Sequence, residues 1–195
     1  RLPYVDPAMF VPTLVDRRPC VLFTTTMHNI DKKGLPEFAR AMCRIPSMRA
    51  RCVVRQPERM PKLPDSIKRR MEMGSVEKGE MVSLYHRMWV NCRVSREESS
   101  PLSILESMVC ELPQIVSTTV AAQIPIIEDG ATGFVVDPDD NDRLVWALRT
   151  VLGDRRLRDR MGRECRRRAR QLGLEHRIAE FERVKLVIEA FTRTR

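Results

Sequence analysis

The sequence predicts an α/β fold, with a Rossmann-like, doubly wound parallel sheet followed by C-terminal helices. Short apolar runs rich in β-branched residues alternate with longer stretches of helical periodicity, which is the pattern of βα units. From residue 139 onward the pattern is helical almost to the end of the chain. Of the 195 residues, 43% are hydrophobic and 31% are charged, which is typical of a globular chain with one sizeable core.

The first part of the chain is expected to contain three strands and one helix. Residues 20–26 and 50–56 are short β-branched runs, and the apolar periodicity of residues 35–45 predicts the helix between them. Residues 57–66 carry three prolines, so this connection cannot be helical throughout. The run KRRMEMG, residues 68–74, is expected as the third strand.

The middle of the chain continues the alternation. Residues 76–88 are expected as a helix, because Met81, Leu84, Tyr85 and Met88 fall on one helical face. The segments that follow are predicted, in order, as a strand, a helix, a strand and, after the turn EDGATG, a final short strand: 89–95, 102–111, 113–119 and 133–137.

The remaining residues are predicted to be helical. The segment 139–153 begins with Asp and Asn residues that suit a helix N-cap and ends at Gly153. Two further helical segments are expected at 154–173 and 175–191. We therefore divide the chain into a Rossmann-like domain over residues 1–174 and a C-terminal helix within residues 175–195.

Charge and cysteine content limit the classes of function. Lys and Arg number 35 against 26 Asp and Glu, so a phosphate-bearing ligand, a nucleic acid or an anionic membrane surface are all compatible partners.

No run approaches the roughly 18 apolar residues of a membrane span, and the N-terminal residues lack the apolar core of a signal peptide. Six dispersed cysteines do not have zinc-site or disulfide-scaffold spacing. We expect a cytoplasmic chain with reduced cysteines and no metal.

An arginine-rich segment runs from Arg155 to Arg170 and contains nine arginines. A solvated helix face is the favoured interpretation, and an anionic membrane surface is the next candidate partner. A nucleic-acid module would interleave aromatic residues for base stacking, and none lies between Trp146 and Phe181. Nucleic acid is therefore the least favoured of the three.

Two glutamates, Glu98 and Glu106, lie eight residues apart where a predicted strand ends and the next helix begins. Ligands of doubly wound sheets bind outside the carboxyl ends of the strands. A carboxylate there can accept hydrogen bonds from the vicinal hydroxyls of a ribose or a sugar ring. The alternative is that both glutamates are solvated residues that favour a helix N-terminus.

The stretch SREESSPLSILESMVCELPQIVST, residues 95–118, resembles the signature that carries the E-x7-E motif of glycosyltransferase family 4 in the GT-B superfamily. Four more blocks resemble this family in the same order along the chain: YVDPAMFVP, DKKGLPEFARAM, GEMVSLYHRMWV and IIEDGATGFVVDPDD. The resemblance implies the donor half of a GT-B fold in a retaining glycosyltransferase of polysaccharide-biosynthesis type. Such an enzyme moves a sugar from a nucleoside-diphosphate sugar to a glycan or lipid-linked acceptor.

The resemblance also implies roles for residues of this chain. Glu98 would contact the donor sugar, Glu106 would bind the ribose hydroxyls, and Lys33 would hold the diphosphate, so Glu98 and Lys33 are the candidate catalytic residues. Further donor contacts would come from the backbone around Ser99, Ser100 and Leu102 and from the segment that contains His28, Lys32 and Gly34. No cofactor and no metal are implied.

Partners follow from the same resemblance. A nucleotide sugar is the ligand, and an N-terminal acceptor-binding domain is expected in cis or in trans. Residues 175–195 would cross to that domain. Because relatives act on lipid-linked acceptors, the chain is compatible with a peripheral place at the inner face of a membrane, through Arg155–Arg170.

This sequence departs from the family pattern at several positions. His28 stands where an Arg is usual, and Lys32 replaces it only in part, because a lysine cannot form the bidentate fork of an arginine. Glu111 stands where Gly is usual, which predicts an altered donor pocket. Two alternatives therefore remain: a catalytically inert sugar-nucleotide-binding module, and a basic module that binds nucleic acid or a membrane surface.

Overall fold

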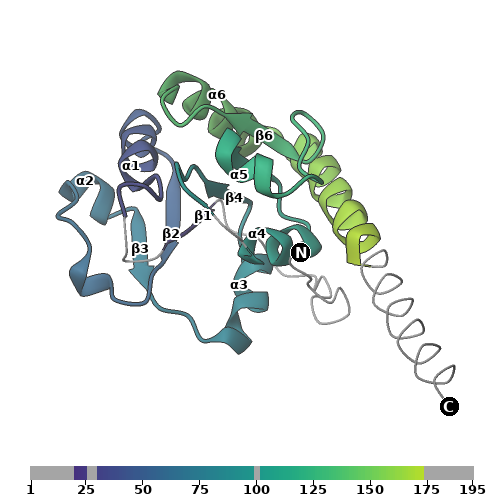
Figure 1. Cartoon of the computed structure of the whole chain (residues 1–195). Coiled ribbons are helices and arrows are strands. Elements are labelled where there is room, and N and C mark those ends of the chain that lie inside the picture. Colours follow the sequence, from purple (N-terminus) through teal and green to yellow (C-terminus); the bar gives the residue numbers. More distant parts are fainter. Residues whose placement is uncertain (1–19, 26–29, 99–101, 174–195) are drawn as a thin grey trace, which may run out of the picture.

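Six parallel strands form one sheet in the computed structural model, which describes residues 20–25, 30–98 and 102–173 (Figure 1). Their spatial order is β3-β2-β1-β4-β5-β6. The chain builds outward from β1 to β3 and then crosses back to place β4 on the other side of β1, as in doubly wound folds. The predicted α/β Rossmann-like fold is confirmed. The strands are β1 (Cys20–Thr24), β2 (Arg49–Val53), β3 (Met71–Gly74), β4 (Val90–Arg93), β5 (Gln114–Ser117) and β6 (Gly133–Val136).

Helices connect the strands. The α-helices are α1 (Leu35–Arg44), α2 (Asp65–Lys68), α3 (Met81–Arg87), α4 (Leu102–Val109), α5 (Thr118–Gln123) and α6 (Asn141–Gly153), and the 3-10 turns are η2 (Pro57–Arg59) and η3 (Lys78–Glu80). Residues 155–173 form a further helix. The expected helix over 175–191, and with it the division of the chain at residue 175, lies outside the described residues.

Three local expectations were wrong. Residues 68–70 are not strand, because Lys68 ends α2 and the Arg70 side chain turns back to bond the Ser66 carbonyl at 2.8 Å. The strand expected over 113–119 ends at Ser117, and its last two predicted residues, Thr118 and Thr119, instead begin the helix α5, which was not predicted. The Ser117 side chain caps α5 by accepting from the Val120 N–H. Residues 76–77 are not helical, and helical structure begins only with η3 at Lys78.

Alternate residues of β1 point to opposite faces of the sheet and mark its two helical layers. Val21 and Phe23 lie in one apolar cluster with side chains of α1 and α6, and the Phe23 ring stacks on Phe38 of α1 with centroids 4.6 Å apart. Leu22 instead packs with Tyr85 of α3 and other residues of a second cluster. Because both faces are covered, the central strands β4 and β5 are fully buried.

A buried polar network fixes β4, α4 and β5 relative to one another. The Asn91 side-chain amide donates to Ser107 Oγ at 3.2 Å and to Gln114 Oε1 at 2.9 Å. Gln114 Nε2 donates to the Leu112 carbonyl at 2.6 Å. Buried polar groups are stabilising only when they are hydrogen-bonded, so these three side chains specify how α4 sits against the sheet. This orientation matters because α4 carries Glu106.

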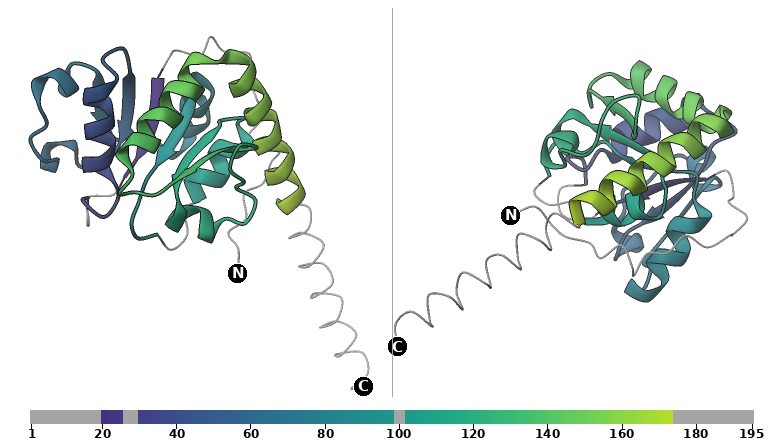
Figure 2. Two further views of the ribbon diagram at one scale, coloured as in Figure 1. Left: turned by 90° about the horizontal axis from the view of Figure 1, so that it is seen from above. Right: turned by 90° about the vertical axis from the view of Figure 1, so that its right-hand side faces the viewer.

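The arginine-rich helix packs along the α4 and α5 side of the sheet (Figure 2). Its arginines are only partly a solvated face, which corrects the expectation. The Arg158 guanidinium lies 3.8 Å from the ring centroid of Trp89, and Arg166 donates to the Val109 carbonyl at the end of α4. Arg168 pairs with Glu164 at 2.6 Å. The exposed members include Arg156, Arg160, Arg163 and Arg170.

The six cysteines form no disulfide with one another, and four of them, Cys52, Cys92, Cys110 and Cys165, are buried. Within the described residues, no helix combines the length and apolar character needed to cross a membrane.

Candidate functional site

Glu98 lies at the carboxyl edge of the sheet, in the loop that follows β4, and is bound by two cations. Arg93, the last residue of β4, places Nη1 2.9 Å from Glu98 Oε2, and Lys33 Nζ lies 3.1 Å from Glu98 Oε1. The Glu98 side chain is 7% exposed. The solvated-residue interpretation of Glu98 is therefore wrong. The ion pair between Glu98 and Lys33 was not predicted, and the roles expected of these two residues in donor binding stay predictions.

The pKa of the Glu98 carboxyl is held below its usual value. Burial alone would raise that pKa, because a less polar environment disfavours the charged form. The charges and hydrogen bonds of Arg93 and Lys33 outweigh the burial. Glu98 is therefore a carboxylate at neutral pH and acts only as a hydrogen-bond acceptor.

Arg93 is a site residue that sequence analysis missed. It is 8% exposed, and its Nη2 donates to Thr24 Oγ1 at 2.6 Å and to Ser103 Oγ at 2.9 Å. The guanidinium thus joins the end of β1, the loop after β4 and the first turn of α4. The available signal was a charged residue at the end of an apolar strand run, because buried charges in proteins are nearly always paired.

Lys33 is held between two elements and is not a freely solvated lysine. Its side chain is 18% exposed, and Nζ also donates to the Glu97 carbonyl at 3.0 Å. The neighbouring Lys32 is exposed and pairs with Glu97 at 2.7 Å. The Arg96 N–H donates to the Lys32 carbonyl at 2.7 Å, which joins the segment before α1 to the loop after β4.

Gly34 makes this close approach possible. Its φ is 82°, and a Cβ at this position would lie 2.3 Å from the Val94 carbonyl oxygen. Only glycine combines that left-handed conformation with so little space. The structure therefore gives Gly34 a role in backbone packing, whereas its predicted role in donor binding stays a prediction.

Glu106 lies on α4 and is oriented by α3. The Tyr85 hydroxyl donates to Glu106 Oε2 at 2.7 Å, and the Tyr85 side chain is fully buried. Burial, and then the Glu106 carboxylate, raise the pKa of Tyr85, so the phenol keeps its proton. Ser103, which contacts Arg93, lies three residues before Glu106 on the same helix and is thus its neighbour on the helix surface. Arg93 and α4 thereby connect the two glutamates.

The other predicted donor-binding residues are placed only in part. Leu102 begins α4 and is 44% exposed. His28, Ser99 and Ser100 lie outside the described residues. Glu111 has a left-handed φ of 61° at the end of α4. Glu111 thus takes part in the turn that ends α4, whereas its expected effect on the donor pocket stays a prediction.

A second ion cluster, which the sequence did not predict, holds the loop of Glu98 in place. Arg96 Nη2 lies 2.9 Å from Glu37 Oε1 and 2.6 Å from Asp139 Oδ1. Glu37 belongs to α1, and Asp139 lies in the connection between β6 and α6. This cluster fixes the loop of Glu98 to two further elements. Among the described residues, no group of three His, Cys, Asp or Glu side chains could hold a metal ion.

Residues 71–168, half of the chain, match the family model of glycosyl transferases group 1. The chain belongs to the glycosyl transferases group 1 family. Arg93, Glu98 and Glu106 lie within the matched residues of this group 1 chain, and Lys33 lies before them.

One curated relative is sulfoquinovosyl transferase SQD2 of Arabidopsis thaliana. It is 32% identical to this group 1 chain over 95 residues, which are 48% of this chain and 19% of that protein. This group 1 chain therefore spans about a fifth of the length of that relative.

Solved structures show the same fold. Sucrose-phosphate synthase from Thermosynechococcus elongatus superimposes with a TM-score of 0.79 at 21% identity, over 96% of this chain and 51% of that one. Alr3699/HepE from Anabaena, solved in complex with UDP and glucose, superimposes with a TM-score of 0.76 at 16% identity, over 93% of this chain and 55% of that one. This group 1 chain spans about half the length of these proteins, and the likeness shows the fold alone.

Proposed function

We propose that this chain is the donor-binding half of a retaining glycosyltransferase of family 4 and that Glu98 and Glu106 are the glutamates of its E-x7-E motif. The observation that carries the proposal is the cluster of Arg93, Lys33 and Glu98 at the carboxyl ends of β1 and β4. Because the strand order reverses between β1 and β4, this is the position where doubly wound sheets bind ligands. Membership of the group 1 family supports the proposal.

The charges of the cluster suit a nucleoside diphosphate. Two cations face one carboxylate, so an excess of positive charge remains for a diphosphate. Lys33 is the cation with some solvent access and stabilises the negative charge that develops on the leaving diphosphate. Arg93 is more deeply buried and pairs with the same carboxylate as Lys33, in a chain where His28 stands in place of the usual arginine. No step of this chemistry uses a metal.

The two carboxylates divide the recognition of hydroxyl groups. A carboxylate offers about four lone-pair sites, so the hydrogen bond from Tyr85 leaves Glu106 able to accept from the ribose hydroxyls. Glu98 accepts from a hydroxyl of the donor sugar and keeps its charge because Arg93 and Lys33 lower its pKa. Backbone groups near Ser99, Ser100 and Leu102 complete the donor contacts.

Transfer requires a second domain that presents the acceptor. The donor half holds the leaving group but does not by itself orient an acceptor hydroxyl against the sugar. Orientation of two reactants contributes roughly 7–11 kcal/mol of barrier lowering, so donor binding without transfer is expected from residues 1–195 alone. The glycan or lipid-linked acceptor would be supplied by an N-terminal domain, in cis or in trans.

Calorimetric titration with UDP, GDP, ADP and their glucose derivatives tests the proposal. UDP is tried first, because the structurally similar Anabaena protein was solved with UDP and glucose. A ligand at a hundredfold excess over its Kd should also stabilise the chain by about 2.7 kcal/mol, visible as a thermal shift. If no nucleotide binds at millimolar concentration, the donor-site proposal is wrong.

Substitutions separate the roles of the two glutamates. Glu106→Ala should weaken the free diphosphate by about 1–3 kcal/mol, because a charged hydrogen-bonding partner is lost. Glu98→Ala should weaken the sugar nucleotide much more than the free diphosphate. Glu58→Ala, at an exposed position of η2, is the control and should change neither affinity. Equal losses for both ligands in both variants would reject the assignment.

Turnover distinguishes the enzyme from a catalytically inert binding module. The chain is incubated with its tightest-binding sugar nucleotide and candidate acceptors, with and without a separately produced N-terminal domain of a group 1 enzyme. Transfer that depends on the added domain and is lost in Glu98→Ala supports the half-enzyme proposal. Donor binding with no transfer under either condition favours the inert module.

A further inference from the structure

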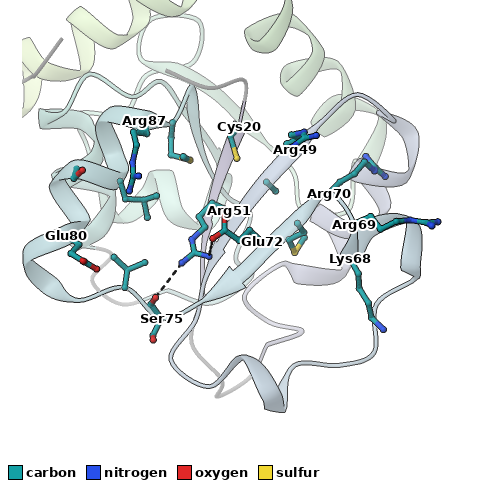
Figure 3. A pocket seen from close by; sticks show the side chains of 16 residues that line it. Cys20, Arg49, Arg51, Lys68, Arg69, Arg70, Glu72, Ser75, Glu80 and Arg87 are labelled. Carbon is teal, nitrogen blue, oxygen red and sulfur yellow. Dashed lines mark hydrogen bonds and ion pairs between the residues drawn. The ribbon is translucent and has the colours of Figure 1, made fainter. Parts of the chain in front are cut away.

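A concave site lies apart from the cluster of Arg93, Lys33 and Glu98. It is a groove of about 830 Å³ between α3 and the strands β1, β2 and β3 (Figure 3). Its walls come from the first residues of the three strands, from the end of α2 and from α3. Cys20, Arg49 and Met71 are those first residues, so the groove begins at the amino ends of these strands, and it runs over the sheet face to Ser75 beyond β3. The candidate donor site lies at the carboxyl ends of β1 and β4, and Arg93, Lys33 and Glu98 do not line the groove.

The floor of the groove is a sheet face that no helix covers fully. In β2, Ala50 and Cys52 point toward α1 and are buried, whereas Arg51 lies on the opposite face. Arg51 there pairs with Glu72 of β3 at 2.9 Å. Parallel sheets are normally covered on both faces by apolar packing. A charged pair on an open face of parallel strands indicates a surface that stays in contact with water or with a polar ligand.

Positive charge dominates the groove. Six cationic side chains line it against two carboxylates, Glu72 and Glu80. The cations are Arg49, Arg51, Lys68, Arg69, Arg70 and Arg87. Burial, and then the charge of Glu72, raise the pKa of the Cys20 thiol to about 11, so the thiol adds no negative charge at neutral pH.

Several of these cations remain available to a ligand. Arg70 is used internally, because its guanidinium donates to the Met42, Ile45 and Met48 carbonyls at the end of α1. Arg49, Arg69 and Arg87, in contrast, are exposed. Arg87 approaches the groove from α3 and Arg49 from β2, so they lie on opposite sides of it (Figure 3).

We propose that this groove binds a soluble small molecule that carries two or more phosphate groups, at a site separate from the donor site. Arginine is the side chain best suited to phosphate, because its planar fork of N–H donors binds the oxygens in pairs. The volume lies within the range of small-molecule sites. Bound phosphate would bring Arg49, Arg51 and Arg87 together around one anion.

The shape and composition of the groove disfavour the other anionic partners. Arg51 is recessed, with a side chain that is 14% exposed, so a flat membrane surface does not reach it as a small anion does. No aromatic side chain is among the described residues that line the groove, whereas single-stranded nucleic acid is held by base stacking on aromatic rings. A small polyphosphate fits both observations.

Calorimetric titration with inorganic tripolyphosphate tests the proposal. The double variant Arg49→Ser/Arg87→Ser should bind tripolyphosphate about tenfold or more weakly than the unmodified chain, since charge-assisted hydrogen bonds are lost. Both residues are exposed, so the variant should fold. The matched control, Lys62→Ser/Arg149→Ser, removes the same charge at exposed positions outside the groove and should retain full affinity. Lys33→Ala should also retain this site, which separates it from the donor site.

Three outcomes would overturn the proposal. The first is no tripolyphosphate binding by the unmodified chain. The second is an equal loss of tripolyphosphate affinity in the groove variant and in its matched control, which would mean that net charge alone determines that affinity. The third comes from co-sedimentation with vesicles of phosphatidylserine and phosphatidylcholine: if the groove variant loses vesicle binding while tripolyphosphate does not compete, the groove docks on a membrane and not on a soluble phosphate.

Discussion

The Arg93 guanidinium lies 2.9 Å from Oε2 of Glu98, and each side chain is less than one-tenth exposed. The two residues stand five positions apart, one at the end of β4 and one in the loop beyond it. A buried ion pair has a large desolvation cost, so it contributes little net stability but makes the loss of either partner expensive. Its position at the carboxyl edge of the sheet links the stability of the loop to the proposed donor site.

Removing one partner of this pair should be costly, and removing both should be less so. Arg93→Met should lower the free energy of unfolding by about 3 kcal/mol, because Glu98 loses its more buried partner. The loss of unfolding free energy in the double variant Arg93→Met/Glu98→Gln should be clearly smaller than the sum of the losses in the two single variants. Urea denaturation of the four proteins measures this difference. Additive losses would show that the pair is not energetically coupled.

The pair should also make stability depend on pH. The folded-state pKa of Glu98 lies below its unfolded-state value, which is about 4.3 for a free Glu. The stabilisation is therefore fully present above about pH 4.3 and is lost as the pH falls through the folded-state pKa. The difference in unfolding free energy between the unmodified chain and Glu98→Gln should be constant from neutral pH down to about pH 4.3 and should shrink at lower pH. A difference that grows on acidification would contradict the assignment.

Tyr85 should act on ligand binding through Glu106. Tyr85→Phe removes the hydroxyl that donates to Glu106 Oε2 at 2.7 Å. We expect a loss of about 1.5–3 kcal/mol in unfolding free energy, as for one hydrogen bond to a charged group, and a lower affinity for the nucleoside diphosphate. The binding loss should disappear in a Glu106→Ala background, because the carboxylate that Tyr85 orients is then absent. Calorimetry on the four combinations measures this, and an equal loss in both backgrounds would exclude action through Glu106.

Glu111 should be replaceable by glycine with a gain in stability. Its φ is 61°, and the N–H groups of Glu111 and Leu112 bond the Met108 and Ser107 carbonyls in the pattern of a Schellman turn. A left-handed conformation costs a non-glycine residue roughly 1–2 kcal/mol. Glu111→Gly should thus raise the melting temperature, whereas the control Glu111→Ala, which keeps the Cβ, should not. A lower melting temperature for the glycine variant would contradict this account.

Gly34 should tolerate no side chain. In Gly34→Ala the new Cβ would lie 2.3 Å from the Val94 carbonyl oxygen in a backbone with φ of 82°, so we expect a loss of about 2 kcal/mol or more. Gly79→Ala is the control, because a Cβ there meets nothing within 4 Å. Thermal unfolding of the two variants compares them. Similar melting temperatures for Gly34→Ala and Gly79→Ala would mean that the backbone around Gly34 accepts a Cβ without loss of stability.

The fold class and most of the elements can be predicted from the sequence. The short β-branched runs of β1, β2, β4 and β5 and the helical period of α1, α4 and α6 are local signals, because each element must bury apolar side chains in the core. The five blocks that resemble the glycosyltransferase family point to Lys33, Glu98 and Glu106 as candidate site residues from the sequence alone. Elements too short for a periodic signal, such as α5, were missed.

The partners of the charged residues, in contrast, follow from the folded arrangement of the chain. Lys33 and Glu98 are 65 positions apart in the chain, and Arg96 reaches both Glu37 and Asp139. Such contacts arise because parallel crossovers bring distant strand ends to one edge of the sheet, and no local pattern encodes them. For the same reason Arg93 was predicted only as part of a strand, although its side chain pairs with Glu98. The basic groove depends on the sheet in the same way, because its arginines belong to segments that meet only after the strands have paired.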